Sequence, residues 1–247
     1  MKDKEAQSER DYFDSYTRTN IHRDMIKDDV RTEAYRRAIM QNKHLFKDKV
    51  VLDVGCGTGI LTLFAARAGA KKVYGVDMSD FSYLAGQNVV KNGYLDKVDI
   101  IKGKMEEAEL PEKVDVIISE WMGYCLFYES MLDSVLFARD KWLKEGGIIL
   151  PDKVELWVGA FQNESFTENT ENLSNMWGFD MTALRELAFK EPAIRLLNDH
   201  TKSIFTNTPF RVKEFDLMKD TVADIEFESE FTLKVDKHAT FSVKGLI

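Results

Sequence analysis

The sequence predicts an α/β protein in which a doubly wound parallel sheet is followed by a second, mainly antiparallel unit. From about residue 50 to residue 150, short apolar strands alternate with helices, which is typical of a parallel sheet covered by helices on both faces. After Pro151, apolar and polar residues alternate within the strands, which is typical of antiparallel sheets. We therefore expect a first domain at residues 1–150 and a second at residues 151–247.

The first domain begins with a predicted helix at residues 24–42, capped by Asp24. Its apolar face is predicted from a four-residue spacing and consists of Ile26, Val30, Ala34 and Ala38. The apolar run at residues 50–52 is the first strand, and a helix follows it that ends at Gly69. The apolar face of that helix is predicted to be Leu61, Phe64, Ala65 and Ala68.

The remaining elements of the first domain alternate regularly. In order, they are a strand at 72–76, a helix at 81–91, strands at 98–102 and 114–119, a helix at 130–143 and a strand at 148–150. In such a sheet the ligand binds at the carboxyl ends of the strands, so we expect the functional residues there.

The second domain combines predicted strands with a helical insertion. The strands are predicted at 154–158, 210–217, 225–235 and 240–243, and the insertion at 164–198, around Leu184, Leu187, Ala188 and Ile194. The sequence stops at Ile247, within or just after a strand, where a sheet would be left with an unpaired edge. We therefore expect a mainly antiparallel second unit with a helical insertion.

Composition excludes several classes of protein. Cys56 and Cys125 are too few for a disulfide framework, and no apolar run is long enough for a signal peptide or a membrane span, so we expect a cytoplasmic or nuclear protein without membrane contact. The four histidines match no metal-ligand spacing, so no metal is expected. The formal net charge of −8 disfavours direct nucleic-acid binding and suits basic partners.

A glycine cluster after the first strand indicates a cofactor site. Gly55, Gly57 and Gly59 stand at a strand-to-helix junction, where glycines allow a ligand to approach the backbone closely. Asp53 precedes them, and Asp77 ends the next strand, where a carboxylate can accept hydrogen bonds from ribose hydroxyls.

A nicotinamide oxidoreductase is the alternative for this layout. Its pattern is G-x-G-x-x-G, but Ile60 stands where the third glycine would fall. The carboxylate of Asp53 would repel a pyrophosphate, whereas it suits a cofactor with an ammonium and a sulfonium group. The string VLDVGCGTGIL resembles the first motif of class I S-adenosylmethionine methyltransferases, which implies that fold and S-adenosylmethionine as the cofactor.

Two glutamates nine residues apart, Glu120 and Glu129, mark a candidate reaction site after the 114–119 strand. On one helix they would face opposite sides, so they converge only if a loop joins them. Gly123 permits a compact loop. The surrounding apolar residues predict that the loop is largely buried; they are Trp121, Met122, Tyr124, Leu126, Phe127 and Tyr128. Two buried carboxylates repel unless a cation lies between them, and a guanidinium fits that geometry.

The segment S-E-W-M-G-Y…E resembles the double-glutamate loop of protein arginine methyltransferases, closest to the predominant type I branch. The resemblance covers about residues 10–245. Further matches lie in Tyr12–Tyr16, in Ile21–Thr32, in Gly178–Met181 and in Lys190–Pro192. It implies transfer of methyl groups from S-adenosylmethionine to arginine side chains, first one methyl and then a second on the same nitrogen, with S-adenosylhomocysteine as product.

The resemblance also implies a role for each matching residue. Glu120 and Glu129 are expected to be catalytic and to hold the substrate guanidinium. The expected cofactor-binding residues are His22, Arg31, Asp53, Gly55, Gly57, Asp77 and Glu106: Arg31 for the methionine carboxylate, Asp77 for the ribose and Glu106 for the adenine region. Tyr16, Met25 and Met131 are expected to form the substrate and methyl pocket.

The resemblance implies partners as well. These are arginine- and glycine-rich proteins, histone tails among them, and a second copy of the chain bound through the arm at 164–198. The resemblance implies that the second domain is a β-barrel, of which this sequence holds only part, so a partial antiparallel β-barrel is expected. Two features depart from the family pattern: Asp77 replaces the usual glutamate, and the sequence ends before the family's Thr-His-Trp loop. The alternative to an active enzyme is therefore a silent cofactor-binding subunit, or a shortened inactive form, that dimerises with an active partner.

Overall fold

The computed structural model describes residues 19–163, 172–188, 190, 203–205, 209–234 and 243–246. The described residues up to Val154, together with Phe215–Phe227, form one compact unit; those within Glu155–Glu214 and Glu228–Ile247 form another. Phe215 and Leu217 are fully buried in the core of the first unit. Their segment therefore packs with the first unit, although the sequence places it in the second domain.

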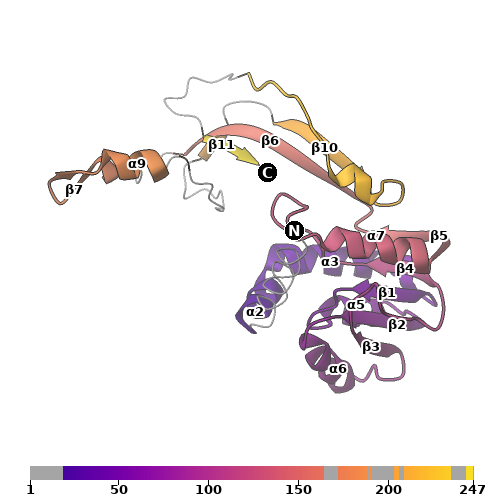
Figure 1. Cartoon of the computed structure of the whole chain (residues 1–247). Coiled ribbons are helices and arrows are strands. Elements are labelled where there is room, and N and C mark those ends of the chain that lie inside the picture. The colour runs from indigo at the N-terminus through magenta and orange to yellow at the C-terminus, as the bar shows by residue number, and fades with distance from the viewer. Residues whose placement is uncertain are drawn as a thin grey trace. The chain divides into compact units, whose positions relative to one another are not determined.

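The first unit contains the predicted parallel sheet. Its five strands are β1 (Val50–Val54), β2 (Lys72–Asp77), β3 (Val98–Lys102), β4 (Val114–Ile118) and β5 (Leu143–Leu150). They lie in the order β3-β2-β1-β4-β5, and every neighbouring pair is parallel (Figure 1). The doubly wound fold is confirmed. The last strand is longer than predicted and begins directly after the preceding helix.

Helices cover both faces of this sheet. They are α2 (Thr19–Lys27), α3 (Asp29–Gln41), α4 (Lys43–Phe46), α5 (Ile60–Arg67), α6 (Phe81–Lys91) and α7 (Met131–Trp142). Strand residues alternate between two cores, because successive side chains of a strand point to opposite faces. Leu52 packs in the core under α7, whereas Val51 packs in the core with α3, α4 and α5. The predicted inner face of α5 is confirmed, since Leu61, Phe64, Ala65 and Ala68 are all buried.

The first predicted helix is two helices. The chain breaks at Asp28, whose carboxylate accepts the backbone N–H of Arg31 and thereby caps α3. The cap predicted at Asp24 is wrong, and so is the predicted apolar face, because Val30 is 84% exposed and Ile26 is 41% exposed. The inner side of α3 carries Tyr35 and the fully buried Ile39 instead.

The second unit contains an antiparallel sheet and a helical excursion. The strands are β6 (Lys153–Asn163), β9 (Ser203–Phe205), β10 (Phe210–Asp216) and β11 (Val243–Leu246), with β6 at the centre. The excursion contains η1 (Asn172–Ser174), the hairpin of β7 (Asn175–Met176) and β8 (Phe179–Asp180), and α9 (Thr182–Ala188) (Figure 1). Leu184, Leu187 and Ala188 belong to α9, whereas Ile194 and most of the second half of the predicted arm lie outside the described residues.

The strand predicted at 225–235 is wrong. The chain instead forms the η3 turn (Val222–Ile225), and no regular strand follows over residues 226–234. The turn begins there because Thr221 and Asp224 form a capping box, in which the Asp224 carboxylate accepts from both the backbone N–H and the hydroxyl of Thr221. Over the described part of the chain, no helix is long and apolar enough to span a membrane.

Candidate functional site

The carboxyl edge of the parallel sheet gathers the predicted site residues. Strands β1, β2 and β4 end at Val54, Asp77 and Ile118, side by side in the register of the sheet. The glycine loop follows β1, and the loop of residues 119–130, called here the double-glutamate loop, follows β4. The sheet topology therefore places the candidate cofactor residues and the candidate catalytic residues on one edge.

The glycine loop needs its glycines. Gly55 and Gly57 have φ values of +70° and +51°, a backbone region that costs other residues strain. A Cβ at Gly55 would lie 2.1 Å from the Met131 methyl carbon, and one at Gly57 would lie 3.6 Å from the His22 ring. Met131 and His22 thus flank the loop. His22 is 5% exposed and stacks on Phe81 with the ring centroids 3.5 Å apart.

Asp53 lies beneath this loop, fully buried. One carboxylate oxygen accepts the Thr62 hydroxyl at 2.5 Å, and the other, Oδ1, has no hydrogen-bond partner. Burial raises the pKa of Asp53 to about 7, against the lowering effect of Thr62, and the charge of Asp77 adds to the rise. A buried carboxylate oxygen without a donor is costly, so this atom suits a positively charged or N–H-bearing ligand group.

Asp77 joins the two loops that the cofactor would contact. Its Oδ2 accepts the Gly57 backbone N–H at 2.7 Å, and its Oδ1 accepts both the backbone N–H and the hydroxyl of Ser79, at 2.8 and 2.5 Å. Each carboxylate oxygen has two lone pairs, so capacity for a ribose hydroxyl remains. Sequence reasoning missed Ser79, although a serine two residues after an aspartate is a common turn signal.

Glu106 is exposed in the segment after β3. Its carboxylate accepts the Ser134 hydroxyl from α7 at 2.6 Å. This contact fixes the side chain on the α7 side of the sheet. Ser134 carries no sequence signal for such a role.

The double-glutamate loop is compact, as predicted. Gly123 and Leu126 exchange two backbone hydrogen bonds, and Cys125, Leu126 and Ser130 have positive φ values. Gly123 is required because a Cβ there would lie 2.6 Å from Cγ of Glu129. The loop therefore turns Glu129 back across Gly123 toward the end of β4.

The prediction that this loop is largely buried is only partly right. Trp121 is 2% exposed, but Tyr124 is 58% and Tyr128 is 79% exposed. The loop's inner side packs in the core, whereas its tip presents two tyrosines to solvent. The aromatic run alone could not separate these two sides.

Helix α3 brings a cation to the loop. Nη2 of Arg31 lies 2.5 Å from Oε2 of Glu120, and both side chains are largely shielded from solvent. One helical turn later, the Tyr35 hydroxyl donates to the Ser119 carbonyl at 2.8 Å. Tyr35, which sequence reasoning missed, thus anchors the helix that carries Arg31, and its i+4 spacing from Arg31 was the only available signal.

The charges at Glu120 oppose one another. Burial raises its pKa, the Arg31 guanidinium acts to lower it, and the Glu129 charge raises it again. The net direction is upward, so Arg31 compensates only part of the cost. The Glu129 charge acts on Glu120, so the two carboxylates lie near each other. The site can therefore stabilise a further cation, and the cation that Glu120 already holds is a guanidinium.

Comparison with known proteins agrees with this geometry. A family model described as a methyltransferase domain matches residues 51–147, and one described as the arginine methyltransferase oligomerization subdomain matches residues 152–245. The structure of the Trypanosoma brucei PRMT1 enzyme–prozyme heterotetrameric complex with AdoHcy superposes with a TM-score of 0.80 at 44% identity, over 90% of this chain and 69% of that one.

The chain belongs to the protein arginine methyltransferase family.

Other members of the family are similarly close. Arabidopsis thaliana protein arginine methyltransferase 10 superposes with a TM-score of 0.74 at 38% identity, over 87% of this chain and 67% of that one. Protein arginine N-methyltransferase 1 of Dictyostelium discoideum is 51% identical over 90% of this chain. Protein arginine N-methyltransferase 8-B of Danio rerio is 48% identical over 95% of this chain. The chain spans only 65% and 56% of the length of these two relatives.

The family resemblance predicts a set of site residues, and most of them lie at one edge of the sheet. Met25, on α2, is half-buried, and its carbonyl accepts the Thr32 hydroxyl. Tyr16 lies outside the described residues. The assigned roles of these residues remain predictions, because the geometry brings side chains together without showing what they bind.

Proposed function

We propose that the chain binds S-adenosylmethionine at the carboxyl edge of the parallel sheet and methylates arginine side chains of proteins. The observation that carries this proposal is the pair of converging glutamates: Glu120 already holds a guanidinium, and its pKa is still raised by burial and by Glu129. A second guanidinium is the ligand that such a site favours, since its fork of N–H donors matches two carboxylates.

The residues present fit the cofactor. Gly55 and Gly57 let the loop backbone come close to Met131 and His22, and Oδ1 of Asp53 is a buried acceptor without a donor. Oδ2 of Asp77 retains a lone pair for a ribose hydroxyl, and Glu106 would supply an acceptor for the adenine region. When bound, S-adenosylmethionine would supply the methyl group from its positively charged sulfur: the nitrogen–methyl bond forms as the methyl–sulfur bond breaks, S-adenosylhomocysteine leaves, and the nitrogen loses one proton to solvent.

The two glutamates position the substrate guanidinium and polarise its charge. The guanidinium stays protonated at any ordinary pH, so its nitrogen lone pairs are delocalised and weakly nucleophilic. Carboxylates on two sides hold the group in one orientation and draw positive charge toward the far nitrogens, which leaves the near nitrogen more nucleophilic. We expect one and then two methyl groups on the same nitrogen.

Arg31 is proposed to serve both sites. In this structure it forms an ion pair with Glu120, and the methionine carboxylate is its second natural partner. Binding of the cofactor would draw the Arg31 charge away from Glu120 and leave that glutamate available to the substrate.

The expected protein substrates are basic segments rich in arginine and glycine, histone tails among them. The net charge of −8 attracts such partners. The T. brucei relative forms a heterotetrameric complex, so association of this chain through its helical excursion is part of the proposal.

The test is methylation of a glycine-rich peptide that contains one arginine. With S-adenosylmethionine present, the peptide mass should rise by one and then two methyl groups. Glu129→Gln keeps the size of the side chain but removes its charge, and loss of one such preorganised group lowers kcat by about 10²–10³-fold. Glu145→Gln, an exposed glutamate in β5, is the matched control and should leave the rate unchanged.

Two outcomes would separate the alternatives. Tight binding of S-adenosylhomocysteine without any methyl transfer would indicate a silent cofactor-binding subunit. Binding of reduced nicotinamide dinucleotide, with no affinity for S-adenosylhomocysteine, would overturn the proposal.

A further inference from the structure

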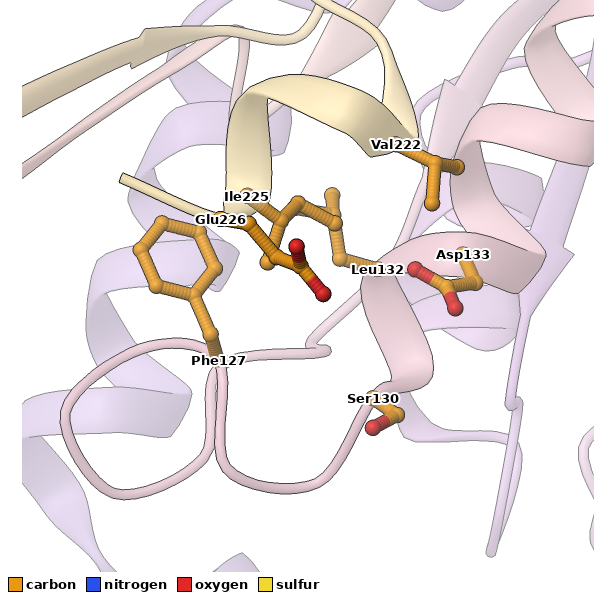
Figure 2. Close-up of a pocket in the computed structure, with 7 residues that line it drawn as sticks. All are labelled: Phe127, Ser130, Leu132, Asp133, Val222, Ile225 and Glu226. Atoms are coloured by element: carbon orange, nitrogen blue, oxygen red, sulfur yellow. The ribbon is translucent and has the colours of Figure 1, made fainter. Parts of the chain in front are cut away.

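A cavity of about 160 Å³ lies beside the double-glutamate loop, between that loop, the first turn of α7 and the η3 turn (Figure 2). Its lining residues all belong to the first compact unit. They are the apolar Phe127, Leu132, Val222 and Ile225 and the polar Ser130, Asp133 and Glu226. The cavity therefore combines apolar walls with two carboxylates.

The two carboxylates face the same space. Figure 2 shows the side chains of Asp133 and Glu226 directed into the cavity from α7 and from the end of η3. Among the described residues, neither carboxylate has a hydrogen-bond or ion-pair partner. Burial raises the pKa of Asp133, and the negative charge of Glu106 adds to the rise. None of the described residues that line the cavity is a lysine or an arginine, so within this part of the chain the two negative charges have no compensating cation.

The cavity adjoins the candidate catalytic site through the chain itself. Phe127 and Ser130 stand two residues before and one residue after Glu129. Since consecutive Cα atoms are about 3.8 Å apart, both lie within about 8 Å of the Glu129 Cα. A peptide whose arginine reaches Glu129 therefore passes close to the cavity.

We propose that this cavity holds a second basic side chain of the protein substrate, within two residues of the arginine that is methylated. The inference rests on the proposed function and adds a preference in substrate sequence to it. Lysine and arginine carry an apolar stem and a charged head, which match the apolar walls and the two carboxylates. In an extended peptide, side chains two residues apart point to the same side, at about 6.6–6.8 Å.

A metal ion fits the cavity less well. Two carboxylates and a hydroxyl are a sparse ligand set for a divalent cation, which prefers six or more oxygens. Within the described ranges, no group of three or more histidine, cysteine, aspartate or glutamate side chains could hold a metal. The aromatic ring of Phe127 on one wall favours an organic cation instead.

The test compares peptides within each enzyme variant. Each peptide has one arginine in a glycine-rich background and either lysine or norleucine two residues before or after it. For the wild type, kcat/KM should favour the lysine peptide about fivefold, the effect of a partly exposed charge pair. In the double variant Asp133→Asn, Glu226→Gln, this ratio should fall to about one, and Glu226→Lys alone should favour norleucine.

The ratio isolates the cavity from any structural role. Asp133 lies in the first turn of α7, where a negative charge also stabilises the helix; weakening the helix would lower both rates together and leave the ratio unchanged. Glu145→Gln removes one charge elsewhere and should retain the wild-type ratio. A wild type without lysine preference, or a double variant that keeps it, would overturn the inference.

Failure of the proposed function gives a different result. If no peptide is methylated by any variant, fluorescence anisotropy of the same labelled peptides measures the lysine-to-norleucine ratio of binding. Loss of that ratio in the double variant would support the cavity even though methyl transfer fails, and equal binding of both peptides by the wild type would reject it.

Discussion

At the scale of the residue, Asp53 shows that a buried carboxylate in the site lowers the stability of the fold. The pKa of this buried carboxyl is raised to about 7, whereas an unfolded aspartate titrates near a pKa of about 3.9. The folded chain therefore binds the proton more tightly. The stabilisation of the fold by this proton is complete below about pH 4 and is lost as the pH rises through about 7. Over that range the free energy of unfolding falls by up to about 1.4 kcal/mol for each pH unit.

Asp53→Asn should remove this dependence. The amide oxygen can still accept the Thr62 hydroxyl, and no charge has to be buried at neutral pH. Relative to wild type, the free energy of unfolding should rise by about 2–4 kcal/mol more at about pH 8 than at about pH 5. Urea unfolding of both proteins at the two pH values measures this change. If the variant and the wild type differed by the same free energy of unfolding at both pH values, the raised pKa of Asp53 would be wrong.

The same substitution should weaken the cofactor site. If the unpaired Oδ1 of Asp53 serves the ammonium end of the cofactor, S-adenosylhomocysteine should stabilise the wild type more than the Asn variant. The free-energy cost of burying the Asp53 charge at neutral pH then has a functional reason. A carboxylate that is costly in the free protein is stabilised most when a cation binds to it.

At the scale of the element, α3 links local capping to the site. The helix begins at Asp29 because Asp28 caps it, and it carries Arg31 in its first turn and Tyr35 one turn later. Asp28→Ala should lower the free energy of unfolding by about 0.5–2 kcal/mol, and fraying of the first turn should lower the affinity for S-adenosylhomocysteine.

Asp24→Ala is the matched control for the cap. Asp24 is exposed, and its side chain contacts only the neighbouring Arg23 in the described structure. Thermal unfolding should change little for this variant, because exposed pairs of this kind contribute little. If both variants lost stability equally, the cap assignment would be wrong.

The elements also show what sequence alone could predict. Helix α6 and strand β3 match their predicted bounds, because both lie between clear turn signals and have a regular apolar pattern. The break at Asp28 was missed, because aspartate side chains compete with helical hydrogen bonds in a way that periodicity does not record. The start of the strand predicted at 225–235 is wrong for the same reason, because the capping box of Thr221 and Asp224 holds Ile225 in the η3 turn.

The candidate site divides in a similar way. Convergence of Glu120 and Glu129 was predictable, because the residues of one short loop are never far apart. The pairing of Arg31 with Glu120 was not, because it joins elements 89 residues apart in the chain. Hydrogen bonds from Ser79 to Asp77 and from Ser134 to Glu106 depend on side-chain positions that no pattern specifies.

At the scale of the whole molecule, the helical excursion presents exposed apolar side chains. Trp177 and Gly178 both have positive φ at the tip of the β7–β8 hairpin, as a type I′ turn requires, and this turn leaves Trp177 93% exposed. Further exposed apolar residues follow along the hairpin and α9; they are Met176, Phe179, Met181, Leu184 and Leu187. So many apolar groups on one small element indicate an interface.

We therefore expect the chain to associate through this excursion, and Trp177→Ala to weaken the association. A buried tryptophan at an interface is often worth 2 kcal/mol or more, so the dissociation constant should rise by about 30-fold or more. Light scattering across a concentration series measures this. Met218→Ala removes another exposed apolar side chain and should leave the mass unchanged. Monomeric wild type at every concentration, or equal effects of both variants, would show that the excursion is not the contact.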